Sequence, residues 1–215
     1  MKQTEITKKL NNLLIFDKKS LKILENRNSA LDANIKYWLK NKNLIALKNG
    51  VYIIREKYEK EKDKNLYLEY LANQLLKPSY LSLEYVLSKY QILSEPVNAI
   101  TSITTKQSRL FINELNAWRY YSLPSALFTG YKTKSFAGQP VLEASKAKAL
   151  FDFFYLRLKR NNNINISNLR LNLENMKPSD WKEFFCYFKN KKSTKWNNLR
   201  QELKQYAKKS TPRIS

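Results

Sequence analysis

Hydrophobic residues in the first part of the chain follow the period of a helix and then that of a strand. Leu31, Ile35 and Leu39 recur at every fourth position beside Trp38, which predicts an amphipathic helix capped by Asn28 or Ser29. Two β-type runs, 44–47 and 51–54, follow and are separated by Lys48-Asn49-Gly50, a tight-hairpin signal. A polar-faced helix before a basic hairpin is typical of a winged helix-turn-helix. In that fold the recognition helix enters the DNA major groove and the hairpin, the wing, reaches a phosphate or the neighbouring groove.

Two weaker helical patterns precede this pair. Residues 4–14 place Ile6, Leu10, Leu13 and Leu14 on one face, and residues 20–24 predict a short second helix after a polar break at 17–19. We therefore assign residues 1–56 to a DNA-binding domain and the charged residues 57–64 to a solvated linker or the start of a helix.

Residues 65–215 predict a second, mixed domain. Its helices are expected at 65–76, at 82–90 with Ser82 as the cap, from Ser145 through Leu158, from Pro178 to Phe188 and at 195–208, with a loop that contains a short helix at 161–175. Its strands are expected at 99–105, 110–112, 117–121, 126–132 and 139–144. The predicted class is thus α+β: a winged helix-turn-helix, then a small, mainly antiparallel sheet with aromatic, basic C-terminal helices.

Composition narrows the classes of function. Forty basic and eighteen acidic residues give a net charge of +22, which indicates a polyanionic partner, although abundant Lys and Asn also fit an AT-rich coding bias. Histidine is absent and Cys186 is the single cysteine, so a Cys/His zinc site and an intrachain disulfide are excluded. Three separated glycines exclude a phosphate-binding glycine loop. Without a signal peptide or a long apolar run, we expect a soluble, cytoplasmic protein with no membrane contact.

The candidate DNA contacts lie on the polar helix face and the hairpin tip. Lysines suit phosphate contacts, whereas Asn and Ser can read base edges, and Asn34 is the best candidate for bidentate recognition of adenine. The set is Ser29, Asn34, Lys36, Tyr37 and Lys40 from the helix, with Lys48 and Asn49 from the hairpin. Lys106 and Arg109 fit a charged hairpin tip better than a DNA contact. The basic C-terminal helices fit a second nucleic-acid surface or, better, a solvent face over an aromatic core.

Catalysis is the competing class. A metal-dependent nuclease needs converging acids, and the second domain offers Glu84, Glu114, Glu143 and Asp152. They show no diagnostic spacing, and Asp152, beside Leu150 and Phe153, fits a helix-surface or buried hydrogen-bonding role. We therefore expect no catalytic residues, metal or cofactor, and no enzyme.

Three sequence blocks of the second domain resemble those of a known protein family. They are Lys77-Pro78-Ser79-Tyr80-Leu81-Ser82-Leu83-Glu84, Ile100-Thr101-Ser102-Ile103-Thr104-Thr105-Lys106 and Glu143-Ala144-Ser145-Lys146-Ala147-Lys148-Ala149-Leu150-Phe151-Asp152, in this order. Over residues 4–155 the chain resembles the AbiEi family of antitoxins, found in type IV toxin–antitoxin and phage-resistance operons. Where that family has Ser-Pro-Glu-Lys-Ala-Leu, this chain has Lys146 and Ala147 in place of Pro and Glu, so no role of that acid carries over. Residues after 161 match no known pattern.

The resemblance implies a repressor that binds inverted repeats in its own promoter and counters a nucleotidyltransferase-type toxin. The residue patterns alone support the DNA-binding half. A stand-alone winged-helix regulator with a sensing or dimerisation domain is the alternative, and a neighbouring nucleotidyltransferase gene would separate the two.

Overall fold

The N-terminal unit forms a three-stranded antiparallel sheet with one long helix. The computed structural model describes residues 10, 13–23, 25–160, 164–189, 191 and 193–209. The unit contains β1 (Phe16–Asp17), η1 (Ser20–Ile23), α2 (Asn28–Lys40), β2 (Leu44–Lys48) and β3 (Val51–Ile54), with strand order β1-β3-β2. Gly50 closes the hairpin with φ +72°, a conformation that suits glycine. The predicted helix and hairpin are confirmed.

Three expectations for this unit need correction or fall outside the described residues. The second helix is a 3-10 turn, and β1 stands beside the expected break. Arg27 occupies the N-cap position of α2 and no side chain caps it, so neither Asn28 nor Ser29 is the cap. Most of the helix expected at 4–14 lies outside the described residues; Leu10 is helical, but Leu13 and Leu14 are not.

The second part of the chain is built on a six-stranded mixed sheet. Its strands are β4 (Ser79–Leu81), β5 (Ala99–Thr104), β6 (Arg109–Ile112), β7 (Ala117–Ser122), β8 (Tyr131–Phe136) and β9 (Gln139–Ala144), in the order β6-β7-β5-β4-β9-β8. Three pairings are antiparallel, whereas β4–β9 and β5–β7 are parallel. The α+β class is confirmed, but the sheet is larger and more mixed than expected.

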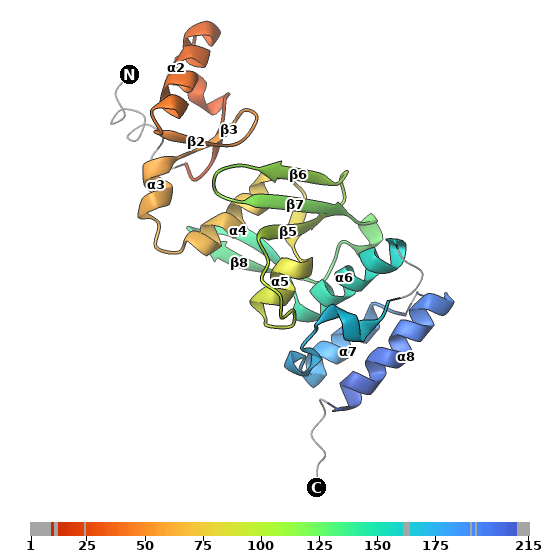
Figure 1. Ribbon diagram of the computed structural model, residues 1–215. Helices are drawn as coiled ribbons and strands as arrows, with labels where there is room; N and C mark the ends of the chain where they lie inside the picture. Colours follow the sequence, from red (N-terminus) through yellow and green to blue (C-terminus); the bar gives the residue numbers. More distant parts are fainter. Residues whose placement is uncertain are drawn as a thin grey trace.

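Helices cover the two faces of this sheet unequally (Figure 1). They are α3 (Arg55–Lys60), α4 (Lys64–Leu75), α5 (Leu83–Lys89), α6 (Lys146–Arg160), α7 (Pro178–Cys186) and α8 (Thr194–Lys209), with 3-10 turns η2 (Ser125–Leu127), η3 (Ile166–Leu169) and η4 (Leu173–Asn175). The Tyr120 hydroxyl donates to the carbonyl of Ala72, which ties α4 to one face. α5 and α6 lie on the other face, and α7 and α8 close the C-terminal end.

The remaining differences from the sequence expectations are local. The segment 57–64 is partly helical, since α3 runs to Lys60. β4 was not expected, and the strand expected at 126–132 starts only at Tyr131, because residues 124–128 close 3-10 turns. Ser82 does precede α5, but its hydroxyl donates to Asp152 instead of capping the helix.

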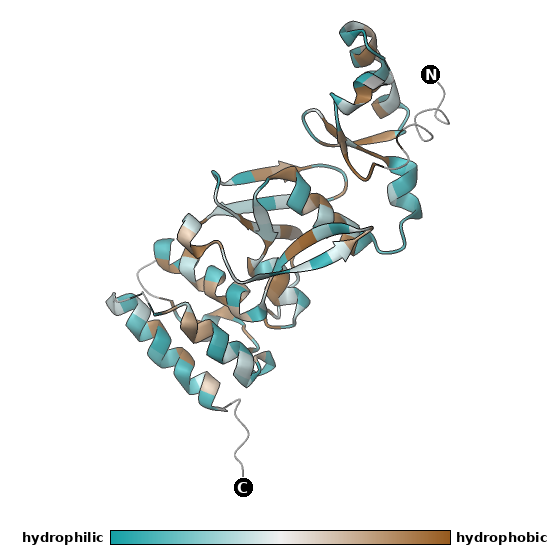
Figure 2. Cartoon of the chain, turned by 180° about the vertical axis from the view of Figure 1, so that it is seen from behind, coloured by the Kyte–Doolittle hydropathy of each residue, from teal (hydrophilic) through white to brown (hydrophobic). Residues whose placement is uncertain are grey.

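The small sheet has an apolar face on each side. Leu44, Tyr52 and Ile54 pack with Leu31 and Trp38 in a core of the N-terminal unit. Ile45, Leu47 and Ile53 belong instead to the large core of the second part. In Figure 2 the hairpin strands are largely brown and the central sheet mixes brown, white and teal, whereas α3 and α8 are mostly teal. The hairpin is therefore packed against the body of the protein.

Candidate nucleic-acid interface

One face of α2 is open to solvent at the free end of the molecule (Figure 1). Leu31, Ile35 and Trp38 are buried against the small sheet, as the four-residue spacing predicts. After the first residue, Asn28, the exposed positions are Ser29, Asp32, Ala33, Lys36, Tyr37 and Lys40. Tyr37 is 58% exposed, an unusual degree for an aromatic side chain. Four of the five helix residues predicted to contact DNA therefore share one accessible surface.

Asn34 is the fifth, and it lies elsewhere. It is half-buried, three residues from buried Leu31 and four from buried Trp38, on the flank of the helix that turns toward the small sheet. Ser29 and Ala33 occupy the middle of the open face. Of the two polar candidates for base contact, Ser29 is the better placed.

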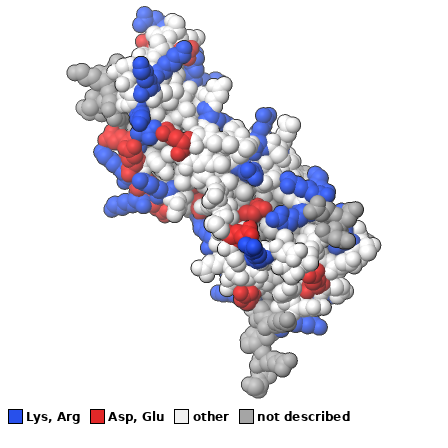
Figure 3. Space-filling view, in the orientation of Figure 1, with Lys and Arg blue, Asp and Glu red and all other residues white. Residues whose placement is uncertain are grey.

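The cations of this unit outnumber its acids, and two of the described acids are paired. Asp32 pairs with Lys18 (Nζ–Oδ1 2.5 Å), Glu25 pairs with Arg27 (3.2 Å), and Asp17 accepts hydrogen bonds from Ser20. Within the described residues, five exposed lysines of this unit form no ion pair: Lys19, Lys22, Lys36, Lys40 and Lys42. Figure 3 shows several blue Lys and Arg side chains on the surface at this end of the molecule. The surface is thus suited to a polyanion.

The hairpin tip is differently placed. Lys48 donates its ammonium to the Leu75 carbonyl of α4 (2.6 Å) and lies over the ring of Phe111 on β6 (5.4 Å). Burial, together with the charge of Lys106, lowers the pKa of Lys48. The side chain of Asn113 donates to the Leu47 carbonyl (2.8 Å). Asn49 is exposed at the tip. Lys48 therefore has a partner within the protein that competes with any phosphate.

The four acids considered for catalysis do not converge. Each pairs with a basic side chain of its own: Glu84 with Arg157 (3.6 Å), Glu114 with Arg55 (2.6 Å), Glu143 with Lys134 (2.6 Å) and Lys89 (2.8 Å), and Asp152 with Lys148 (2.5 Å). Within the described residues, no three Asp, Glu, Cys or His side chains are grouped so that they could hold a metal ion. This arrangement offers no support for a metal-dependent nuclease.

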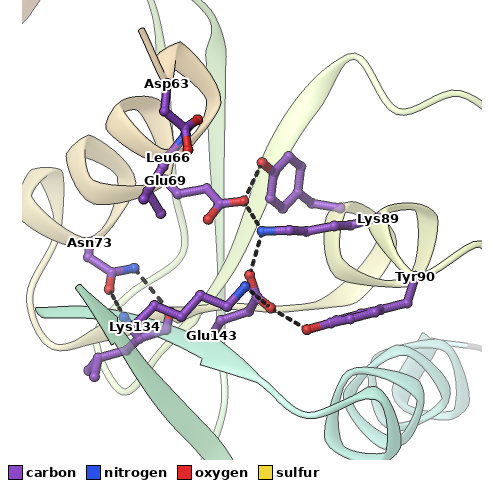
Figure 4. A network of polar contacts seen from close by, with 10 residues as sticks. Asp63, Leu66, Glu69, Asn73, Lys89, Tyr90, Lys134 and Glu143 are labelled. Atoms are coloured by element: carbon purple, nitrogen blue, oxygen red, sulfur yellow. Dashed lines mark hydrogen bonds and ion pairs between the residues drawn. The ribbon is translucent and has the colours of Figure 1, made fainter. Parts of the chain in front are cut away.

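One of these acids, Glu143, belongs with Glu69 to a polar cluster that sequence reasoning did not assemble (Figure 4). The Lys89 ammonium bridges Glu69 of α4 and Glu143 of β9, and the hydroxyls of Tyr85 and Tyr90 donate to Glu69 and Glu143 respectively (2.8 Å each). Burial opposes ionisation of Glu143, but its hydrogen bonds from Lys134, Lys89 and Tyr90 prevail and hold its pKa below its usual value. Burial and Glu143 raise the pKa of Tyr90 to about 12. Glu69 is missing from the sequence prediction because it gives no signal of its own within a helix.

A cleft of about 500 Å³ opens beside this cluster, lined by Asp63, Leu66, Glu69, Tyr85, Lys89 and Lys134 among others. Its volume falls in the range of small-molecule sites. Because the two lysines are already paired with buried carboxylates, the cluster primarily ties α4, α5, β8 and β9 together.

The three sequence blocks meet in space. β4, from the first block, pairs with β5 of the second and with β9 at the start of the third. Asp152 accepts hydrogen bonds from Tyr80 (2.9 Å) and Ser82 (2.8 Å), and Thr101 donates to the Ser82 carbonyl (2.6 Å). Asp152 and Lys148 are completely buried. Of the two roles expected for Asp152, the structure shows the buried hydrogen-bonding one.

The weaker candidates are also placed. Lys106 is exposed in the connection between β5 and β6, and Arg109 is exposed as the first residue of β6. In the C-terminal part, Lys195 donates to the Leu158 carbonyl (2.8 Å), and Lys191 lies over the rings of Tyr155 and Trp196. Phe151, Phe184, Phe188 and Trp196 form the aromatic core beneath. These two lysines cover an aromatic core, the second of the two roles considered for this region.

Comparison with known proteins adds no family assignment. No protein-family model matches the chain, and no curated protein matches it. Among the described residues, no helix is both long and apolar enough to cross a bilayer.

Proposed function

We propose that this chain is a DNA-binding transcriptional repressor of the AbiEi antitoxin type, which reads its own promoter with α2. The observation that carries the proposal is the open face of α2, where Lys36 and Lys40 stand beside Ser29 and Tyr37 and form no ion pair in the described part of the chain, since Asp32 on the same face pairs with Lys18. Lysines at these positions suit phosphates, and a helix is the element that a major groove admits.

The order of elements supports a winged helix. β1, η1, α2 and the β2–β3 hairpin follow one another, and β1 joins the hairpin in one antiparallel sheet behind the helix. Because the hairpin packs on α4 and β6, we assign the wing a structural role and the groove contact to α2 alone. Lys48 is therefore left out of the proposed interface.

The antitoxin part of the proposal rests on the resemblance of the three blocks. Their convergence around Asp152 supports a shared fold, since residues far apart in sequence form one buried network. Co-expression with the product of the adjacent gene, with growth and promoter binding as readouts, tests it. Restored growth supports an antitoxin. Promoter binding without any effect on growth favours the stand-alone regulator, for which the cleft beside Glu69 offers a place to sense a ligand.

The DNA-binding part is tested by fluorescence anisotropy with a labelled duplex of the chain's own upstream region and a scrambled duplex of the same composition. Titrations at several salt concentrations give the slope of log K against log salt. If both lysines contact phosphates, the Lys36→Ala/Lys40→Ala variant should flatten that slope by about 1.8, because each phosphate contact contributes about 0.9.

The matched control is Lys132→Ala/Lys204→Ala, which removes two exposed lysines far from α2 and keeps the net charge equal. An unchanged slope is expected for it. Equal losses in both double variants would mean that net charge, and not the α2 face, supplies the affinity. Failure of the full-length wild type to bind at low salt would end the proposal.

A further inference from the structure

The sheet has an apolar surface that no helix covers. Side chains alternate along β6, so Phe111 packs edge-on against Tyr120 on the α4 side while Leu110 and Ile112 project from the opposite face. α5 and α6 cover that opposite face over β4, β5 and β9 (Figure 1) and reach β7 only where Arg160, the last residue of α6, lies over the ring of Tyr121 (5.6 Å). Leu110 is 48% and Ile112 72% exposed. Clustered exposed aliphatic residues of this kind mark interaction surfaces.

The neighbouring strand extends this surface. In the register of β6 with β7, Leu110 lies opposite Arg119 and Ile112 lies opposite Ala117, on the same side of the sheet as Tyr121. We call Leu110, Ile112, Ala117, Arg119 and Tyr121 the β6–β7 face. The last three also line a cleft of about 430 Å³ together with Val97 and Ala99. A flat apolar patch beside a cleft, with an Arg and a Tyr at its centre, has the composition of a protein interface.

Charge indicates the chemistry of the partner. Arg119 is exposed on the face, and the exposed Arg160 of α6 lies over the ring of Tyr121 (5.6 Å); neither forms an ion pair within the described residues. The acids nearest to the face are already paired: Glu84 with Arg157, Glu95 with Arg170 and Glu114 with Arg55. In Figure 3 the surface over β6 and β7 is largely white, with blue atoms at its border. The uncompensated charge is therefore positive.

Two other occupants fit less well. A second copy would bring the same cations, and a total charge of +22, against this face, which repulsion opposes. A nucleic acid would gain little from Leu110 and Ile112, because unpaired bases stack on aromatic rings and guanidinium planes, not on aliphatic side chains.

We propose that the β6–β7 face docks a protein partner with an acidic surface, whose carboxylates pair with Arg119 and whose apolar side chain enters the cleft beside Tyr121. This surface is separate from the open face of α2, so the proposal does not depend on DNA binding.

The test starts with a photo-crosslinking residue, p-benzoylphenylalanine, at Ile112 of the full chain, expressed in cells that carry the gene in its natural context. Tyr131 is the matched control position, since it is an exposed apolar side chain on β8, the opposite edge strand. We expect one acidic protein, identified by mass spectrometry, to crosslink severalfold more at Ile112 than at Tyr131. The same crosslink should persist in the Lys36→Ala/Lys40→Ala background.

The crosslinked protein is then purified and its Kd for the wild-type chain is measured. Arg119→Glu and Ile112→Asp should each weaken binding at least about tenfold, as expected for central interface residues. Lys132→Glu, the same charge reversal on β8 at the opposite edge of the sheet, should leave the Kd within about twofold, because salt screens exposed charges that lie farther apart than about 10 Å. Circular dichroism confirms that each variant is folded.

Several outcomes overturn the proposal. They are crosslinks at Ile112 that do not exceed those at Tyr131, crosslinks only to a second copy or to nucleic acid, and a folded Arg119→Glu variant that binds the purified partner as tightly as the wild type.

Discussion

Removing the charge of Lys148 should destabilise the protein strongly. Lys148 and Asp152 stand one turn apart on α6 and are both 0% exposed, with Nζ–Oδ1 at 2.5 Å. The ammonium also donates to the Leu127 carbonyl (2.8 Å), and the other carboxylate oxygen accepts from Tyr80 and Ser82. In Lys148→Met the carboxylate keeps its two hydroxyl donors but loses the one counter-ion that it has among the described residues. Loss of one partner of a buried ion pair costs about 3–5 kcal/mol.

In a chain of this length that cost corresponds to a Tm lowered by about 6–20 °C, since each kcal/mol shifts Tm by about 2–4 °C. Urea unfolding followed by circular dichroism gives the free energy of unfolding. Lys146→Met is the matched control on the same helix: Lys146 is half-buried, and its longer hydrogen bond to Asn175 (3.3 Å) should contribute about 1 kcal/mol or less.

The double variant Lys148→Met/Asp152→Asn tests whether Lys148 and Asp152 stabilise the protein as an interacting pair or independently of each other. With neither charge left, its loss should fall short of the sum of the single losses by about 0.5–3 kcal/mol, the range of coupling between contacting residues. Strict additivity, or a Lys148→Met variant as stable as Lys146→Met, would refute the view that Lys148 neutralises the buried carboxylate through which α6 is hydrogen-bonded to Tyr80 of β4.

Three further predictions concern other parts of the structure. Glu143→Gln should lower stability at neutral pH. The folded-state pKa of Glu143 lies below its unfolded value of 4.5. The contribution of the Glu143 carboxylate to stability is therefore present above pH 4.5 and is lost as pH falls through the folded pKa. The wild type should therefore lose more stability than Glu143→Gln in acid titrations of urea unfolding, and parallel curves would contradict this. Lys48→Met should loosen the hairpin from α4 and speed tryptic cleavage within α3 severalfold, whereas Lys42→Met should not; equal rates would remove the docking role. Ser29→Ala should reduce the preference for the chain's own promoter over the scrambled duplex more than Asn34→Ala does, and the reverse order of effects would mean that the flank of α2, not its open face, reads the bases.

The elements that the sequence predicted well are those with a repeated local signal. α2 has three apolar residues at helical spacing, and the β2–β3 hairpin has Asn-Gly between two β-branched runs. β4 was not predicted, because the three residues between Pro78 and Ser82 are too few to show an alternating pattern, yet β4 lies at the centre of the sheet. Its position depends on pairing with β5 and β9, about 20 and 60 residues further along.

The same limit applies to the sites. Helical spacing located the open face of α2, because exposure follows directly from the period of the buried side. It could not show that Lys48 turns inward, since the acceptor is a carbonyl 27 residues away on α4. Nor could it pair Glu69 with Glu143, which meet through Lys89 from a third element. A local sequence pattern cannot show which distant residue a single polar side chain contacts in the folded protein.

A net charge of +22 does not by itself identify which surface of the protein binds DNA. Many of the cations are committed within the protein: Lys48, Lys148 and Lys195 donate to carbonyls, and Arg55, Lys89 and Lys134 pair with acids. Releasing such a group to reach a phosphate would forfeit a contact that the fold uses, so its net gain is small. Uncommitted lysines on a rigid helix carry no such cost, and this difference is why Lys36 and Lys40, rather than the total charge, should determine the salt dependence of binding.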